Sequence, residues 1–305
     1  MAESVSNRSS KGVLLSVMAS VLFSVLYYFV TLLGPLDATE IFGWRMLLTA
    51  PCVALFVVLS GAWPQVRDIA ERARTHGALW LAMPVCALLL AVQLLLFMWA
   101  PLHNRALEVS LGYFLLPLLM VVIGRLHYGE RLTPLKRVAT LCAAFGVCHE
   151  LYRVGSVSWE TLVVALGYPL YFILRRRFRL DSLGGFCFDV WLMVPIAVYL
   201  VLHGPSTLAT YRAHPALFGL VPVLGLISAA ALVSYMVSSR LLPFGLFGLL
   251  GYVEPVMLLG VALLLGGRIS GDAWLTYAPI WLGVAMLVAE GAMHVLASRA
   301  SHAAR

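Results

Sequence analysis

Charged residues are scarce in this sequence. Asp, Glu, Lys and Arg make up only 11% of the 305 residues and hydrophobic residues 62%, and the mean hydropathy is +0.93. Soluble domains average about 25% charged and roughly 45–50% apolar residues, so the composition excludes a soluble globular protein and predicts an integral membrane protein. The net charge of +7 does not indicate nucleic-acid binding, because the basic residues are spread over short loops between apolar runs.

Cysteines and catalytic motifs are also few. The five cysteines all lie inside apolar runs and have no paired metal spacing, which favours buried thiols and predicts no metal site. The chain lacks H-E-x-x-H, a Gly-rich phosphate loop and G-x-S-x-G, and His149-Glu150 has no second histidine four residues on. These absences argue against an enzyme, a cofactor and an ATP-driven pump, and leave ion gradients or facilitated movement as the energy source.

Long apolar runs dominate what is present. A helix needs about 20 apolar residues to cross the hydrocarbon, and ten such spans can be drawn, the fifth being the shortest in apolar length: 12–33, 38–59, 77–100, 106–126, 135–152, 157–174, 184–203, 216–239, 244–266 and 273–297. The longest polar connection, 62–76, is predicted to be a short helix at the membrane interface. We therefore expect an all-α integral membrane protein with ten transmembrane helices.

The distribution of Lys and Arg predicts the orientation. With the N-terminus inside, sixteen of the 21 basic residues fall in inner segments and four in outer loops, while Arg45 lies within a span. The positive-inside rule then places both termini in the cytoplasm. The first apolar run continues to Leu33, too long for the core of about 7–15 residues of a cleaved signal peptide.

The spacing of prolines and glycines indicates an internal repeat. Pro84, Pro117 and Gly129 each recur 138 residues later, and Pro51 recurs as Pro195 after 144. Each copy has five spans, an odd number, so the second copy enters the membrane in the opposite orientation. The sequence thus predicts two inverted five-helix repeats, residues 1–152 and 153–305, with a substrate site near the midplane between them.

Of the charged residues within predicted spans, three are the candidates for a function, namely Arg45, Asp189 and Glu254. A charge near the bilayer centre costs about 2.5–3.5 kcal/mol and is usually kept for a function. Arg45 and Asp189 each precede a proline by six residues, so the repeat places them at equivalent positions. We expect Arg45 to receive a substrate carboxylate and Asp189 an amino group or a proton. The alternative is that Arg45 pairs with Glu40 or with Asp189 and only fixes helix packing.

Glu254, directly before Pro255, is expected near the midplane, where it couples transport to protons, contacts a cationic substrate group or pairs across the bundle. Polar side chains at span centres complete the predicted site, and helix packing is the alternative for each: Tyr28, Gln93, Tyr113 and Tyr252. Glu150 and Glu160 fall at span ends and are expected at headgroup level. The arginines at 175, 176, 177 and 179 are expected to anchor the topology in the cytoplasm, in contact with anionic lipid.

The fourth span carries the clearest family resemblance. Its ordered residues are Glu108, Ser110-Leu111-Gly112-Tyr113-Phe114, Pro117-Leu118, Gly124 and Gly129-Glu130-Arg131-Leu132. This order resembles the RarD family, a branch of the EamA-domain, drug/metabolite transporter superfamily. Further matching positions are Glu40-Ile41 with Arg45, the FMWA sequence at 97–100, the acid before Val194-Pro195-Ile196-Ala197, and Tyr252 with Pro255.

The resemblance implies a ten-helix bacterial inner-membrane protein that exports amino acids or related small metabolites, and it supports Arg45, Tyr113, Asp189 and Tyr252 as cavity positions. The chain departs from the family pattern at Gln93 and at Glu254, which suggests a changed substrate. An added acid and a retained arginine suit a polar zwitterion, of which an opine- or nicotianamine-like metallophore is one specific form.

We therefore expect a secondary transporter that exports a small polar, amino-acid-like metabolite by alternating access, coupled to protons, as a monomer or homodimer. The alternatives are efflux of hydrophobic or cationic drugs of the chloramphenicol type, metabolite uptake and, from another class, a membrane-embedded scaffold or enzyme.

Overall fold

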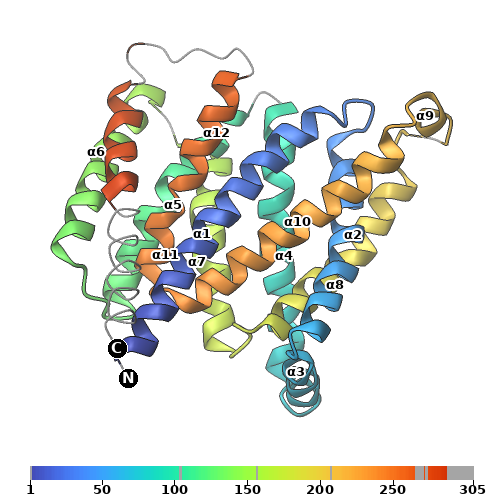
Figure 1. Cartoon of the computed structure of the whole chain (residues 1–305), viewed down its shortest axis with the longest axis horizontal. Helices are drawn as coiled ribbons and strands as arrows, with labels where there is room; N and C mark the ends of the chain where they lie inside the picture. Colours follow the sequence, from blue (N-terminus) through green and yellow to red (C-terminus); the bar gives the residue numbers. More distant parts are fainter. Residues whose placement is uncertain are drawn as a thin grey trace, which may run out of the picture. The chain divides into compact units, whose positions relative to one another are not determined.

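The computed structural model describes residues 2–102, 105–155, 157–206, 208–264, 271 and 274–286, and this part of the chain is helical without strands. Twelve helices are labelled in Figure 1: α1 (Ala2–Thr31), α2 (Ala38–Leu59), α3 (Trp63–Thr75), α4 (Gly77–Leu102), α5 (Ala106–Leu126), α6 (Pro134–Val154), α7 (Trp159–Arg177), α8 (Leu183–Leu202), α9 (Leu208–Ala213), α10 (Leu217–Leu241), α11 (Phe244–Leu250) and α12 (Val253–Leu264). A further apolar helix covers Trp274–Met286.

Helices lie at the positions predicted from hydropathy as far as the described residues reach, since the ninth and tenth predicted spans are described only in part. Within the described residues, six segments are long and apolar enough to cross a membrane: Ser10–Thr31, Ala38–Leu59, Gly77–Ala100, Glu108–Leu126, Leu183–Leu202 and Leu217–Leu241. The predicted short polar helix is α3, which has only Ile69 and Ala73 buried along its inner face. The apolar runs therefore form a multi-helix membrane bundle, in which backbone polar groups are satisfied within each helix.

The ninth predicted span is not one helix. The backbone tightens at Gly251 and Tyr252, so that α11 ends and α12 begins at Val253. Pro255 has no N–H to donate to the Gly251 carbonyl, and the Glu254 N–H bonds that carbonyl instead at 3.3 Å. The interruption therefore lies just before Pro255, and the proline itself is in the first turn of α12. In contrast, α5 continues through Pro117.

The helices form two compact units. Unit 1 contains Met1–Ser24, Ser110–Leu166 and Val237–Arg305, and unit 2 contains Val25–Val109 and Gly167–Met236. Each unit combines helices from both halves of the sequence. The compact units are therefore different from the predicted repeats, 1–152 and 153–305, which concern internal symmetry and stay a prediction.

In unit 2, α2 and α8 run antiparallel. Near the start of α2, Glu40 accepts the backbone N–H of Ser206, which follows α8, at 2.8 Å. Just after α2, Gln65 accepts the N–H of Gly184, at the start of α8, at 3.4 Å. Between these ends Gly43 packs so closely on α8 that a Cβ there would lie 2.9 Å from the Ala197 carbonyl oxygen. Small residues permit such close approach of membrane helices.

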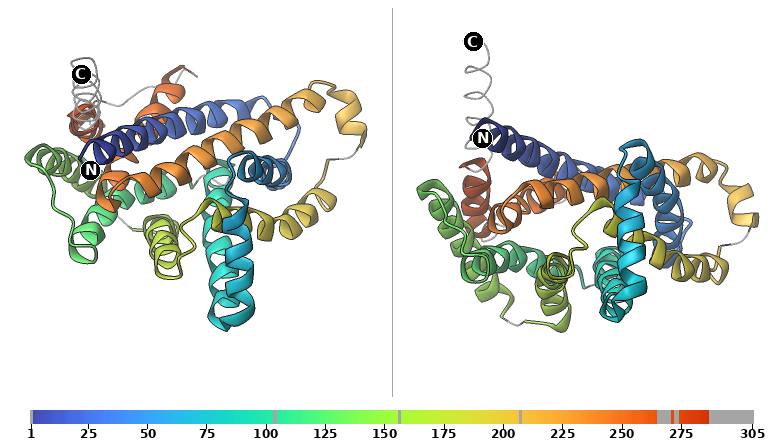
Figure 2. Two further views of the ribbon diagram at one scale, coloured as in Figure 1. Left: turned by 60° about the horizontal axis from the view of Figure 1, so that its bottom comes forward. Right: turned by 90° about the horizontal axis from the view of Figure 1, so that it is seen from below.

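In unit 1, α5 runs antiparallel to α11 and the start of α12. The close contacts fall in opposite order along the two segments: Gly124 with Gly245, Met120 with Gly248, Pro117 with Gly251, and Phe114 with Tyr252. The start of α1 also lies against the end of α10, where the Ser238 hydroxyl donates to the Gly12 carbonyl at 2.9 Å. The views of Figure 2 show this end of α10 beside the first part of α1, both in unit 1.

Candidate functional site

Arg45 lies in the core of unit 2. Its side chain is 1% exposed, and its Nε donates a hydrogen bond of 2.8 Å to the hydroxyl of Ser228 on α10. Arg45 and Thr49 lie one turn apart on α2, and residues four apart share one face of a helix. The Thr49 hydroxyl is buried there without a hydrogen-bond partner. The guanidinium predicted to bind substrate is thus held by a second helix, and Ser228 is a polar neighbour that sequence reasoning did not find.

Glu40 does not form the ion pair with Arg45 that the sequence left open as an alternative. Its carboxylate accepts the backbone N–H of Asp37 at 3.0 Å, within a capping box at the start of α2. The same carboxylate accepts the N–H and hydroxyl of Ser206. Glu40 therefore ties the start of α2 to the segment after α8, and pairing of Arg45 with Glu40 does not explain the buried arginine.

Asp189 on α8 forms a buried ion pair with Arg175 on α7. The Tyr171 hydroxyl also donates to Asp189, at 2.8 Å, and accepts from Arg175 Nη1 at 3.1 Å. Asp189 is 1% exposed, and the other two side chains are equally buried. This arrangement compensates the carboxylate within the protein, so the pairing of Asp189 with Arg45 that was left open from the sequence is not formed.

Arg175 corrects the interpretation of the four neighbouring arginines as one exposed anchor. The Arg175 guanidinium points into unit 2, where it also donates to the Ser182 carbonyl at 2.9 Å. Arg177 and Arg179 are exposed. Four residues separate Tyr171 from Arg175, so both lie on one helix face. A tyrosine and an arginine at this spacing, with an acid in the next span, are the signal that could have revealed the buried group of Tyr171, Arg175 and Asp189.

Gln93 and Tyr28 also belong to unit 2. Gln93 is 1% exposed and packs over Gly167 of α7, where a Cβ would lie 2.0 Å from its Nε2 atom. Tyr28 is 44% exposed.

Trp44, directly before Arg45, contacts the ring of Tyr211 on α9 at 6.3 Å between centroids. Partial burial, followed by the negative charge of Glu40, raises the pKa of Tyr211, which lies outside the spans.

Tyr113, Tyr252 and Glu254 belong to unit 1. The Tyr252 hydroxyl is buried and donates to the Phe114 carbonyl of α5 at 2.8 Å. Phe114 follows Tyr113, whose carbonyl cannot receive the usual helical donor because Pro117 has no N–H. Tyr113 is half-buried. Tyr252 thus joins the turn between α11 and α12 to the proline-containing turn of α5.

Glu254 lies in the first turn of α12 and is half-buried. The N-terminus of a helix carries partial positive charge and favours a carboxylate. Interrupted membrane helices whose half-helix ends face the bundle interior are common at transport sites. The interruption before Glu254 is therefore a feature of a candidate transport site that hydropathy did not predict.

Glu130 is a further residue that sequence reasoning missed. It follows Gly129, which has a φ of 65°, and its carboxylate accepts the N–H groups of Phe244 at 2.5 Å and Gly245 at 2.7 Å. Because Pro243 has no side-chain hydrogen bond with which to cap α11, Glu130 supplies the cap from the other half of the chain. The Gly129-Glu130 pair of the family pattern is thus a link between helices.

Glu150 and Glu160 lie near helix ends, as expected, and both are buried within the protein, which the sequence did not indicate. Their position at headgroup level stays a prediction. Glu150 is 3% and Glu160 1% exposed. Glu150 is paired with Arg153 at 2.5 Å and accepts the Thr276 hydroxyl at 2.8 Å. The Thr276 hydroxyl donates its only hydrogen to Glu150, so its oxygen accepts a hydrogen bond from His149 Nδ1, 2.8 Å away. The end of α6 is therefore joined to the helix Trp274–Met286 by a buried polar chain.

Comparison with known proteins shows which family this chain belongs to. Residues 10–149 match the model of the EamA-like transporter family. Over 279 residues, 90% of this chain and 93% of the relative, the sequence is 48% identical to "Chloramphenicol-sensitive protein RarD" of Pseudomonas aeruginosa. It is 38% identical to an "Uncharacterized transporter" of Haemophilus influenzae, over 92% of this chain and 94% of that protein. A solved structure called "Crystal structure of protein" has the same fold, with a TM-score of 0.63, 19% identity and coverage of 92% and 98%.

A multi-pass helical membrane protein with this matching domain is a membrane transporter of the EamA type. The chain belongs to the RarD family within the drug/metabolite transporter superfamily. The family resemblance inferred from the fourth span is thereby confirmed.

Proposed function

We propose that this transporter exports a small polar, amino-acid-like metabolite across the bacterial inner membrane by alternating access, with both termini in the cytoplasm. The observation that carries the proposal is the buried guanidinium of Arg45, held through Nε by Ser228 inside a membrane span. A charge in that environment is costly, and the planar guanidinium is the side-chain group best suited to bind a carboxylate in a fixed orientation. Arg45 is proposed to bind the carboxylate of the substrate.

The proposed architecture is ten helices in two inverted repeats. Two features support it. The repeat-equivalent helices α2 and α8 run antiparallel within unit 2, and α5 and α11 do so within unit 1. Tyr252 bonds Phe114, and the separation of 138 residues equals the offset between Pro117 and Pro255. Inverted repeats of this kind place substrate and coupling-ion sites near the midplane.

Asp189 is proposed to receive the amino group of the substrate or a proton. Because Arg175 and Tyr171 hold its carboxylate in this structure, either ligand must displace or neutralise one side of that ion pair. Breaking a buried pair is costly. Asp189 would therefore release Arg175 only when the amino group of the substrate or a proton takes its place, and it would switch between two packed states. In this proposal the Arg175–Asp189 pair belongs to the substrate-free protein.

The other proposed site residues are Gln93, Tyr28, Tyr113 and Tyr252, with Glu254 as a second coupling carboxylate at the interrupted helix. The chemistry of this set is polar and amphipathic, and it would suit a zwitterion that carries several amino and carboxyl groups. An opine- or nicotianamine-like molecule is one candidate of this class. The protein is proposed to act as a monomer or homodimer, and protons are the proposed coupling ion.

The test begins with an untargeted comparison of extracellular metabolites in strains with and without the gene, followed by flux of the labelled candidate from proteoliposomes. Arg45→Lys keeps the charge but loses the guanidinium fork, and we expect its export rate to fall at least about tenfold, as for loss of a charge-assisted hydrogen bond. Ser228→Ala should lower the rate less. Near-normal export by Arg45→Lys at equal membrane abundance would remove Arg45 from the site.

Proton coupling has a separate test in Glu254→Gln, which keeps the shape of the side chain and removes its titration. Export by the wild type is expected to follow an imposed pH gradient, and export by the variant is expected to lose that response. If the pH-dependence of flux is the same in both proteins, Glu254 has no coupling role.

Drug efflux is the second candidate function. The observation in its favour is the name of the Pseudomonas aeruginosa relative, which refers to chloramphenicol. This function predicts raised chloramphenicol resistance on overexpression and little effect of Arg45→Lys, because chloramphenicol carries no carboxylate. The two candidates therefore give opposite results in the same variant.

A further inference from the structure

The hydroxyl of Thr49 on α2 is buried without a hydrogen-bond partner. Thr49 is 0% exposed, and its Oγ1 atom forms no hydrogen bond with any described residue. A helix offers such a hydroxyl the carbonyl four residues earlier, and Ser24, Thr140 and Ser234 each donate to it at 2.7–2.9 Å. Because an unpaired buried hydroxyl is destabilising, Thr49 is a candidate for a role outside the packing of the helix.

Thr49 lies beside Arg45, where α2 packs on α10. The two residues are four apart on one helix, so their side chains are neighbours on the same face. Arg45 Nε donates to the Ser228 hydroxyl of α10 at 2.8 Å. One turn along, a Cβ at Gly225 would lie 2.3 Å from Leu48 Cβ and 3.4 Å from the Leu48 carbonyl carbon, which is bonded to the Thr49 nitrogen. Residues 45–49 of α2 therefore pack on residues 225–228 of α10, all within unit 2.

The Ser228 hydroxyl also has a hydrogen to donate. Its oxygen accepts from Arg45 Nε, and a serine hydroxyl has one further hydrogen of its own. Ser228 is 0% exposed, and the described part of the chain supplies no acceptor for that hydrogen. Glu40 and Asp189, the acids considered as partners of Arg45, are bonded to other groups. Two buried hydroxyls beside a guanidinium therefore suit an anionic acceptor.

Both hydroxyls lie near the middle of membrane-spanning segments. Thr49 is about halfway along Ala38–Leu59, and Ser228 is about halfway along Leu217–Leu241. The hydrocarbon at that depth has no water with which to bond a polar group, and secondary transporters bind their substrates near the same depth. The position along both helices thus agrees with a substrate subsite.

We propose that Thr49 and Ser228 are substrate ligands, and that their hydroxyls donate hydrogen bonds to the carboxylate that Arg45 binds. This assignment rests on the proposed function, because it completes the subsite for the same carboxylate. A carboxylate has two oxygens with about four lone pairs, enough for the guanidinium and both hydroxyls. A neutral amide of the same shape has only one oxygen, and its NH₂ group would leave these donors unpaired. The two hydroxyls therefore make the subsite selective for a carboxylate.

Acetate and acetamide are the probes, because they have the same shape and differ in charge. A ligand that binds the folded protein raises its thermal unfolding midpoint, so the midpoint of the purified full-length protein is measured at rising acetate, with the ionic strength kept constant by chloride. Acetate, but not acetamide, should raise the midpoint of the wild type.

Thr49→Val replaces the hydroxyl by a methyl group of similar size, and it should weaken the acetate affinity about tenfold, as for loss of one hydrogen bond to a charged group. Thr49→Ser keeps the hydroxyl and should keep the affinity. Ser228→Ala should also weaken acetate binding, by less than Arg45→Lys.

Stability without ligand separates a binding role from a packing role. Thr49→Val removes an unpaired buried hydroxyl, so its midpoint without acetate should rise. Thr140→Val is the matched control, because it removes a hydroxyl of unit 1 that already donates to the Lys136 carbonyl, and it should leave the acetate affinity unchanged.

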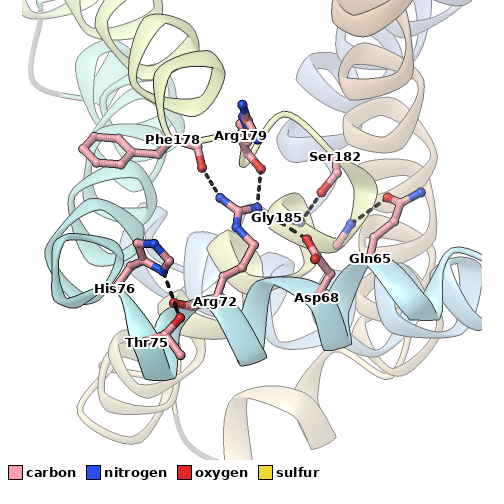
Figure 3. Close-up of polar contacts among 10 residues, drawn as sticks. Gln65, Asp68, Arg72, Thr75, His76, Phe178, Arg179, Ser182 and Gly185 are labelled. Atoms are coloured by element: carbon pink, nitrogen blue, oxygen red, sulfur yellow. Dashed lines mark hydrogen bonds and ion pairs between the residues drawn. The ribbon is translucent and has the colours of Figure 1, made fainter.

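A second control destabilises unit 2 away from the proposed subsite. Figure 3 shows Arg72 of α3, whose guanidinium donates to the Phe178 carbonyl at 2.7 Å and the Arg179 carbonyl at 3.2 Å. Arg72→Ala loses these bonds and should lower the midpoint without changing the acetate affinity. A weaker affinity in Thr49→Val then cannot be ascribed to loosened packing.

The proposal is overturned if Thr49→Val keeps the wild-type acetate affinity or lowers the midpoint without acetate. If Thr49→Val keeps that affinity while Arg45→Lys loses it, the proposed role of Arg45 stands and only the hydroxyl ligands are refuted. If acetate has no effect on the wild type, the carboxylate site at Arg45 is refuted together with them.

Discussion

The Tyr252 hydroxyl donates a hydrogen bond of 2.8 Å to the carbonyl of Phe114, the residue 138 positions earlier in the chain. The same offset separates Pro117 from Pro255. When two copies of a unit are related by a two-fold axis, only residues near that axis meet their own counterparts. Under the proposed inverted repeat, this hydrogen bond therefore lies where α5 crosses its equivalent segment, α11 and α12 with the turn between them.

Tyr252→Phe removes this hydrogen bond and keeps the ring. The Phe114 carbonyl would lose a buried donor, and we expect the free energy of unfolding to fall by about 1 kcal/mol. Titration of the protein with SDS from mixed micelles measures that change. Tyr152→Phe serves as the control, because the Tyr152 side chain is exposed on α6. Equal stability of Tyr252→Phe and wild type would show that the bond does not hold the α11–α12 turn to α5.

Glu130→Ala should destabilise unit 1, because Glu130 is the acceptor for two backbone N–H groups at the start of α11. Loss of a helix cap costs about 0.5–2 kcal/mol, and a charged acceptor places this site toward the upper end. Glu130→Gln keeps a carbonyl oxygen and should lose less. The same SDS titration compares these variants with Glu71→Ala, which removes an exposed acid from α3. The capping role is refuted if Glu130→Ala and Glu71→Ala behave alike.

The buried pair of Arg175 and Asp189 predicts a non-additive mutant cycle. Arg175→Met or Asp189→Leu alone leaves one uncompensated buried charge and should cost about 3–5 kcal/mol, whereas the double variant should recover most of that loss. Unfolding free energies of the three variants measure the coupling. Additive losses would contradict the ion pair.

The same double variant separates structure from transport. If Asp189 acts only in packing, Arg175→Met/Asp189→Leu should restore export together with stability. If Asp189 exchanges Arg175 for substrate or a proton, stability should return while export stays low. Flux from proteoliposomes at equal protein content gives the answer.

Gly167→Ala tests the position of Gln93 without touching it. The added Cβ would lie 2.0 Å from the Gln93 Nε2 atom, so the amide must move, and a flexible side chain can do so with little loss of stability. We expect export to fall to the rate of Gln93→Ala, with no further fall in the double variant. Gly219→Ala is the matched control, since a Cβ there meets nothing within 4 Å. Normal export by Gly167→Ala would show that transport does not depend on the exact position of the Gln93 amide.

The helix positions could be predicted because hydropathy and helix length are local properties of the chain. The α3 segment was found in the same way, from polar residues between two apolar runs. The interruption at Gly251 was not, because Pro117 and Pro255 have similar surroundings in sequence, while α5 continues through its proline and α11 ends before the other. Which proline interrupts a helix depends on the neighbours that satisfy the released backbone groups.

The sequence by itself determined that this protein lies in the membrane and which segments form its helices, because a backbone in lipid must satisfy its hydrogen bonds within each helix. It also located the buried charges of Arg45 and Asp189. Only the tertiary structure decided their partners, Ser228 and Arg175, and placed Glu130 at the start of α11. These contacts join residues far apart in the chain, and they depend on the rotation and packing of whole helices, which no local pattern specifies.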